Sequence, residues 1–350
     1  DITAREILTR GAETVDSGLA DQPAVQGEML DVLGGVHGGL GMYDESRDLL
    51  TRSLGIKRSF YGDRHLETAA TASALGLLEV ESGNYAVAES LLTAAVEVHR
   101  AELGSLDLAV ASDLQGLALL AAYQDKYEEA LVYYREATGI FESDPALQNA
   151  DYGTCLNDYA MMMLDWGKGD QAEPMFRKAL DIQRRELGED HPEVANTLFN
   201  LALLLKHRGD FRAAAPIQRQ VLALDRQHYP DNHPNIAHSL MALGGSLSEN
   251  GQFDEAVRVF SEALEIRRET LSPSHPDLIK NLGTVGLTMS RGGDYAGAEP
   301  LLREAVALCL EHLGIHRITA GRLDDLGWLM RDLGRYEEAL EYHRQAMAMK

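Results

Sequence analysis

The chain has 350 residues, of which 45% are hydrophobic, and its 55 acidic and 32 basic residues give a formal net charge of −23. A charge of this sign disfavours long-range attraction to nucleic acids and anionic membrane surfaces, so neither is an expected partner. No apolar stretch approaches the ~20 residues of a membrane-spanning helix, and the chain is too long for one compact core.

Residues 1–22 are predicted to form a leading helix and a loop, and a repetitive region follows from residue 23. Within it, a glycine or aspartate is usually followed two residues later by an aromatic residue, as in Gly83-Asn-Tyr85. Six of the seven steps between the eight copies are 42 residues and the last is 41, a period typical of stacked supersecondary units. The signatures begin at Gly41, Gly83, Asp125, Gly167, Gly209, Gly251, Gly293 and Gly334.

The apolar residues between signatures follow helical spacing. Leu198, Leu201, Ala202 and Leu205 lie at i, i+3, i+4 and i+7, and no stretch alternates for long enough to indicate a strand. Each period therefore predicts a helix A, a tight turn at the signature, a helix B and a short loop. The predicted repeat units are about 23–64, 65–106, 107–148, 149–190, 191–232, 233–274, 275–315 and 316–350.

Small residues recur at fixed positions in every period, one on helix A and two, seven residues apart, on helix B. Because seven residues are two helical turns, the helix B pair shares one face, and small side chains there let neighbouring helices approach closely. The helix A position holds Gly34, Gly76, Ala118, Ala160, Ala202, Gly244, Gly286 and Gly327.

Histidines and prolines also follow the period. The recurrence of histidine before helix A indicates a structural role, either capping the helix start or packing between repeats. These histidines are His65, His191, His233, His275 and His316. Proline at the first helical position costs no hydrogen bond, which suits Pro192, Pro234 and Pro276. A second set is expected near the first turn of helix B, at Pro174, Pro216 and Pro300.

These signatures and small positions resemble the tetratricopeptide repeat in its elongated form, as in kinesin light chain. Residues 179–202, which read ALDIQRRELGEDHPEVANTLFNLA, are similar to that family's helix B, loop and next helix A. The resemblance covers about residues 23–350 and implies an all-α fold, a right-handed α-α superhelix (solenoid) of about eight helix pairs plus a leading helix. HEAT-like repeats have a comparable period but lack the Gly-x-Tyr and small positions, so they rank lower.

The opening of the chain carries a second resemblance. Residues 2–13 and 19–23 look like the entry into repeat regions that follow the kinase domain of bacterial serine/threonine protein kinases, without any catalytic motif. Since the chain starts at Asp1 and ends at Lys350 inside a helix B, we expect a domain excised from a larger protein. The resemblance implies a substrate-docking or regulatory region of such a kinase.

No sequence motif indicates catalysis, a cofactor or a metal site, so we expect that this chain is not an enzyme. Gly-x-Ser-x-Gly, His-Glu-x-x-His and His-Arg-Asp are absent from the sequence. The glycine-rich run at 34–41 lacks the preceding strand and the Gly-Lys-Ser/Thr of a phosphate-binding loop. His228, His233 and His238 lack further ligands at metal-binding spacing.

In the family that the chain resembles, helix A lines a concave groove, which implies a binding surface for an extended peptide. An amide suits this task because it both donates to and accepts from a peptide backbone. Bases exceed acids at the groove positions although the chain is acidic. The predicted peptide-binding residues are Asn157, Asn196, Phe199, Asn200, Lys206, His238, Met241, Lys280 and Arg291.

The leading hypothesis is a non-catalytic scaffold that binds an extended peptide or a partner protein. The alternatives are the kinase docking region, an enzyme whose active site lies elsewhere in the parent, and a self-assembling module. The last would stack end to end through exposed Met347 and Met349 on an uncapped C-terminal helix. Cys155 and Cys309 are predicted to be buried free thiols, which indicates a reducing compartment and a cytoplasmic location.

Overall fold

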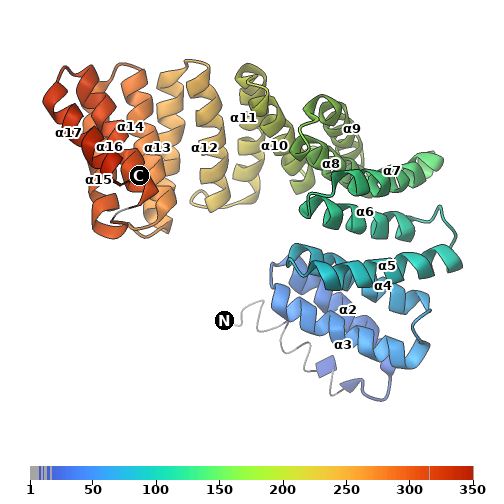
Figure 1. Cartoon of the computed structure of the whole chain (residues 1–350). Helices are drawn as coiled ribbons and strands as arrows, with labels where there is room; N and C mark the ends of the chain where they lie inside the picture. Colours follow the sequence, from blue (N-terminus) through green and yellow to red (C-terminus); the bar gives the residue numbers. More distant parts are fainter. Residues whose placement is uncertain (1–7, 9–10, 12–13, 16–17, 315, 350) are drawn as a thin grey trace. The chain divides into compact units, whose positions relative to one another are not determined.

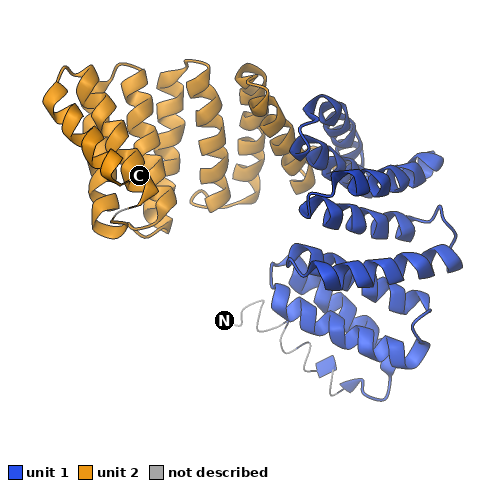
Figure 2. Cartoon of the chain, viewed as in Figure 1, with its two compact units in different colours: residues 1–187 blue, residues 188–350 orange. Residues whose placement is uncertain are grey.

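The computed structural model describes residues 8, 11, 14–15, 18–314 and 316–349. These residues form helices joined by short turns and contain no β-strand, which confirms the predicted all-α fold class (Figure 1). The leading helix predicted in residues 1–22 falls mostly on residues outside the described ranges. Contacts divide the chain into two compact units, residues 1–187 (unit 1) and residues 188–350 (unit 2), coloured separately in Figure 2.

Unit 1 consists of consecutive helix pairs, each with a first helix (helix A) and a second (helix B). The two helices of a pair pack most extensively on each other, and helix B also packs on helix A of the next pair in the unit. The pairs are α2 (Pro23–Gly39) with α3 (Tyr43–Tyr61), α4 (Leu66–Glu81) with α5 (Tyr85–Glu102), α6 (Leu108–Tyr123) with α7 (Tyr127–Ser143), and α8 (Ala150–Asp165) with α9 (Gly169–Leu187). A short 3-10 helix, η1 (Pro145–Leu147), precedes α8.

Unit 2 repeats the same arrangement, again with neighbouring pairs in contact. Its pairs are α10 (Pro192–His207) with α11 (Phe211–His228), α12 (Pro234–Glu249) with α13 (Phe253–Thr270), α14 (Pro276–Arg291) with α15 (Tyr295–His312), and α16 (Arg317–Asp332) with α17 (Tyr336–Ala348). No helix in the described part of the chain has both the length and the apolarity needed to cross a membrane.

Each helix A ends in a turn that needs a left-handed residue. The first residue of every signature has a positive φ, for example 75° at Gly251 and 59° at Asp125, the one non-glycine residue with positive φ in the described ranges. The amide of Gln252 donates to the carbonyl of Leu247 at 2.9 Å, and the amide of Gly251 donates to Ser248 at 3.1 Å. Glycine reaches this conformation without a Cβ clash, so the signature recurs wherever this turn recurs.

The small position on helix A marks the closest approach between the two helices of a pair. A Cβ added to Gly286 of α14 would lie 2.7 Å from Cγ of Leu302 on α15. One added to Gly244 of α12 would lie 2.6 Å from the ring of Phe260 on α13. Both facing side chains are buried, so the glycines let a large side chain pack directly on the helix A backbone.

The periodic histidines cap the helices that follow them. Nδ1 of His275 accepts a hydrogen bond from the amide of Asp277 at 3.1 Å, and His65, His191, His233 and His316 make the same bond to the residue two positions on. The predicted capping role is confirmed. In the third repeat Asp107 takes this position and caps α6 in the same way, at 2.9 Å from the amide of Ala109.

The second set of prolines lies deeper in helix B than the sequence analysis predicts. Pro216 is the sixth residue of α11, and Pro174 and Pro300 hold the corresponding position in α9 and α15. The expectation of a position near the first turn is wrong, because these helices begin at the third residue of the signature, which leaves five helical residues before the proline. Each proline therefore leaves the carbonyl four residues earlier, Arg212 in α11, without its helical donor.

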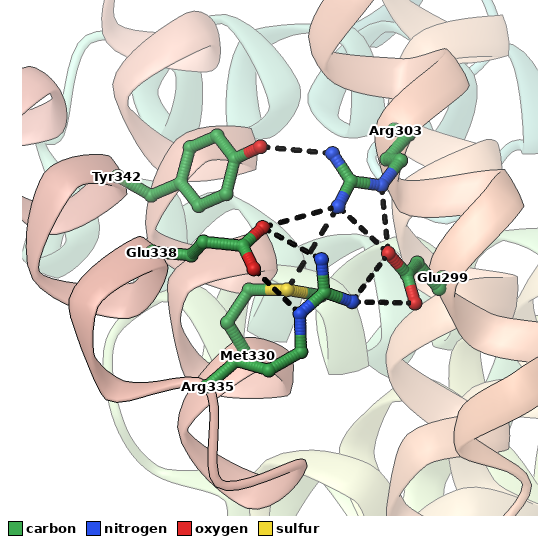
Figure 3. A network of polar contacts seen from close by, with 6 residues as sticks. All are labelled: Glu299, Arg303, Met330, Arg335, Glu338 and Tyr342. Carbon is green, nitrogen blue, oxygen red and sulfur yellow. Dashed lines mark hydrogen bonds and ion pairs between the residues drawn. The ribbon is translucent and has the colours of Figure 1, made fainter.

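Ion pairs link successive B helices. Arg268 of α13 binds Glu304 of α15 at 2.8 Å, and such pairs recur with partners 36 residues apart. The pattern widens into a network beside α17, where Arg335 binds Glu299 at 2.8 Å and Glu338 at 2.6 Å (Figure 3). Each exposed ion pair contributes little to stability. The network nevertheless gives these charged side chains of the B helices partners within the protein.

The last helix presents one of the two methionines that the self-assembly hypothesis relies on. Met347 of α17 is 74% exposed, as that hypothesis requires. The expectation is wrong for Met349, which is half-buried and packs against the apolar cluster containing Leu323 and Met330.

Gly286→Ala is expected to lower the free energy of unfolding by about 1–2 kcal/mol, because the overpacking cost exceeds the gain in helix propensity. The matched control is Gly245→Ala on α12, where no atom lies within 4 Å of an added Cβ. This control should gain about 0.5–1 kcal/mol. Urea unfolding followed by circular dichroism measures both, and a stabilised Gly286→Ala protein would contradict the close approach.

His275→Ala is expected to cost about 1 kcal/mol of unfolding free energy, because it leaves the amide of Asp277 without its capping acceptor. His275→Asp restores an acceptor of the kind that Asp107 already provides, so it should stay within about 0.5 kcal/mol of the unchanged chain. Chemical denaturation compares the two variants. Equal losses in both would show that the histidine acts by packing and not by capping.

Candidate functional site

Unit 2 contains a pocket of about 330 Å³ between α10 and α12, with α11 contributing the third wall. We call it the α10–α12 pocket. Helix A residues form two of its sides and the carboxyl-terminal half of a helix B forms the rest. Its lining residues are Pro192, Ala195, Asn196, Phe199, Val221, Asp225, His228, Tyr229, Asn235, His238 and Ser239.

Three of the predicted peptide-binding residues line this pocket together. Asn196 and Phe199 lie one turn apart on α10, and His238 faces them from α12. The ring centroids of Phe199 and His238 are 5.3 Å apart, and the rings are tilted by 40°. Asn196 and His238 are exposed and Phe199 is half-buried. The pocket therefore offers an amide, an aromatic face and an imidazole to whatever enters it.

Asp225, which the sequence analysis does not single out, supplies the carboxylate of the pocket. The hydroxyl of Ser239 on α12 donates a hydrogen bond to Oδ2 of Asp225. Burial raises the pKa of this carboxyl group, although Ser239 and the nearby His238, His228 and His233 oppose the shift. Within the described ranges Asp225 has no ion-pair partner.

The repeat position of Asp225 is charged in other repeats too, and the partner of the charge differs from one repeat to the next. Lys57 holds this position in the first repeat, and its Nζ lies 2.6 Å from Asp31 and 3.1 Å from Glu67. Arg267 holds it one repeat after Asp225 and donates to the carbonyl of Asp277 at 3.1 Å. A period-by-period comparison of helix B could have drawn attention to Asp225.

Lys206 lies two turns beyond Phe199 on the same face of α10. Its side chain is half-buried, and burial lowers the pKa of its ammonium group. No ion pair or hydrogen bond involves this side chain within the ranges that the structure describes. Met241 of α12 is half-buried and packs against the unit 2 core, so it contributes an apolar surface rather than a polar contact.

The predicted asparagines on helix A differ in accessibility. Asn200 of α10 is 9% exposed, and Asn157 of α8, in unit 1, is 4% exposed. The Nδ2 of Asn157 donates to Oδ1 of Asp158 at 3.1 Å. Both amides are therefore largely covered by their own units, whereas Asn196 is open to solvent.

The two remaining predicted bases have acidic neighbours inside unit 2. Arg291, at the end of α14, binds Glu249 at 2.9 Å and donates to the hydroxyl of Ser248 at 3.1 Å. Lys280 lies 3.8 Å from the carboxylate of Asp277 on its own helix. These contacts offset part of the local excess of bases on which the peptide-binding hypothesis relies.

Cys155 and Cys309 are free and buried, as predicted, and burial raises the pKa of both thiols. The Nδ1 atoms of His228 and His233 bond to backbone groups of their own segments. No group of three His, Cys, Asp or Glu side chains in the described ranges has the geometry to hold a metal ion.

The sequence matches a known repeat family along most of its length. The family model of the tetratricopeptide repeat matches residues 26–101, 75–143, 151–227, 235–311 and 293–350. No curated protein matches the chain. Among solved structures, a putative kinesin light chain from Podosopora anserina with nearly identical repeats is 23% identical, with a TM-score of 0.52 over 55% of this chain and 92% of its own.

Two further solved structures share the fold. BtubC (BKLC) from P. vanneervenii is 20% identical, with a TM-score of 0.53 over 72% of this chain and 93% of its own. A signal transduction ATPase with numerous domains from Pyrococcus horikoshii, which has a tetratricopeptide repeat sensor, is 13% identical. Its TM-score is 0.68 over 99% of this chain and 54% of its own. At these identities the likeness shows the fold alone.

Asp225→Asn is expected to raise the urea midpoint at neutral pH. Burial raises the pKa of Asp225 in the folded state, so the folded chain binds a proton on this carboxylate more tightly than the unfolded chain does. The free energy of unfolding therefore falls as the pH rises from the unfolded-state pKa through the folded-state pKa. The amide keeps an acceptor for Ser239 and removes the charge. The gain should therefore vanish in acid, below the pKa of an unfolded aspartate.

Asp231→Asn, in an exposed loop of the same unit, is the charge-matched control and should leave the urea midpoint unchanged at both pH values. A lower midpoint for Asp225→Asn than for the unchanged chain at neutral pH would contradict the assignment of Asp225 as an uncompensated charge.

Proposed function

The chain belongs to the tetratricopeptide repeat family, and on that premise we propose that it is a non-catalytic scaffold that binds an extended segment of a partner protein. The binding surface lies on the A helices of unit 2. The observation that carries this proposal is the α10–α12 pocket, where Asn196, Phe199 and His238 converge. Solenoids of stacked repeats present extended surfaces, and such proteins use these surfaces for binding.

The distribution of polar side chains in unit 2 supports the A helices over the B helices. Arg219, Arg226 and Arg268 on the B helices are engaged with glutamates of the next repeat. On α10, by contrast, Asn196 is exposed and Lys206 has no ion-pair partner in the described ranges. Groups without internal partners are those that a ligand can satisfy without displacing an existing contact.

The spacing of these groups fits an extended peptide. Phe199 and Lys206 are seven residues apart, which is about 10 Å along α10. An extended chain covers that distance in about three residues. The amide of Asn196 can donate to and accept from the peptide backbone, and Lys206 can bind a carboxylate or a carbonyl of the segment. Asn200 is buried, and Lys280 and Arg291 lie on α14, which does not line the pocket.

The double variant Asn196→Ala/His238→Ala is expected to weaken binding at least tenfold, because both side chains are exposed and belong to the pocket. The probe is the tightest peptide selected from a displayed random library on the unchanged chain, with affinity measured by fluorescence anisotropy. Both residues are exposed, so the thermal unfolding midpoint should change little.

Glu265→Ala, at an exposed position on α13, is the control and should retain full affinity. Failure to select any peptide, or an unaltered affinity in the double variant, would contradict the proposed surface.

A further inference from the structure

We propose that the α10–α12 pocket receives a basic side chain, lysine or arginine, of the bound segment, with Asp225 as its counter-ion. This inference rests on the proposed function, because it specifies the chemistry of a residue in the peptide that the pocket binds. In this proposal Asp225, a helix B residue, determines which peptides bind.

The charge of the pocket is the first argument. Among its lining residues Asp225 is the one carboxylate, and no lysine or arginine lines it. The chain as a whole carries a net charge of −23. A basic segment is therefore attracted at long range and meets a carboxylate at contact, whereas an acidic segment is repelled at both stages.

The hydrogen bonds of Asp225 leave room for a donor from the ligand. Ser239 donates to Oδ2, and no donor from the described residues reaches Oδ1. Ser239 is neutral and contributes no positive charge. A charged donor from a ligand would hydrogen-bond to Oδ1 and neutralise the charge of the carboxylate. Such a charge-assisted hydrogen bond is stronger than one between two neutral groups.

The walls of the pocket suit the stem of a long basic side chain. Phe199 of α10 and Tyr229 both line the pocket, and Tyr229 stacks on His233 with ring centroids 4.2 Å apart. Aromatic faces bind the methylene stems of lysine and arginine, and also a guanidinium plane. The volume of about 330 Å³ is at the low end for ligand pockets and fits one side chain.

Two other repeats place a carboxylate beside the basic side chain at the same helix B position. Lys57 is 3% exposed and has two carboxylates within 3.1 Å. His99 pairs with the buried carboxylate of Asp113 at 2.7 Å. Asp225 has a neutral hydroxyl where these residues have an opposite charge. Its missing counter-charge is what a basic ligand side chain would supply.

The test uses peptides selected on the unchanged chain from a displayed random library. We expect lysine or arginine at one fixed position of the selected peptides, rather than a general excess of bases. Replacing that residue by its neutral isostere, citrulline for arginine, should weaken binding by about 10–100-fold, the range of a charge-assisted hydrogen bond. This arm needs no protein variant and so is independent of folding.

The second arm repeats both measurements on Asp225→Asn. The penalty for citrulline should shrink to less than about threefold there, because the two changes remove the same interaction. Asp231→Asn removes the same charge from an exposed loop, so it should retain the full penalty. If the basic residue were instead attracted only by the net charge of the chain, the loss of affinity on citrulline substitution would be equal in Asp225→Asn and Asp231→Asn. That loss would also become smaller with added salt.

The outcomes separate the two proposals. Selected peptides without a fixed basic residue, or an equal citrulline penalty in Asp225→Asn and the unchanged chain, would overturn the role of Asp225 while leaving peptide binding intact. Selection of no peptide at all would overturn the proposed function and this inference with it.

Discussion

The close approach of the two helices in each pair is the constraint on which the rest of the structure depends. At Gly244 and Gly286 a large buried side chain of helix B packs directly on the helix A backbone, and an added Cβ would clash with it. The left-handed residue that follows, such as Gly251, then reverses the chain within a few residues. Because both requirements recur with the period, one local geometry is copied along each unit, and each pair buries its apolar face against its neighbours.

This packing also decides what the α10–α12 pocket contains. Helix B lies beneath two successive A helices, so a residue near the end of α11 can reach the space between α10 and α12. In this way Asp225 shares a pocket with Asn196 and Phe199, although it lies on the other helix of the pair. The repeat fold places one helix B residue in the pocket, and the identity of that residue, here Asp225, determines which ligand groups it can bind.

The fold could be predicted because its requirements act within a few residues: a positive φ at Gly251, a capping acceptor at His275, a missing Cβ at Gly286. Helical spacing likewise placed Asn196 and Phe199 on one face of α10. Asp225 was missed because the prediction followed helix A alone. The partner of Arg291, Glu249, lies 42 residues away and depends on side-chain conformations that spacing does not encode.

A crystal structure of the chain bound to a selected peptide tests the central claim most directly. The account predicts that a lysine or arginine nitrogen of the peptide lies within hydrogen-bonding distance, about 3 Å, of the Asp225 carboxylate, with its stem against Phe199. A peptide bound along the B helices, or one that leaves Asp225 without a basic neighbour, would contradict it.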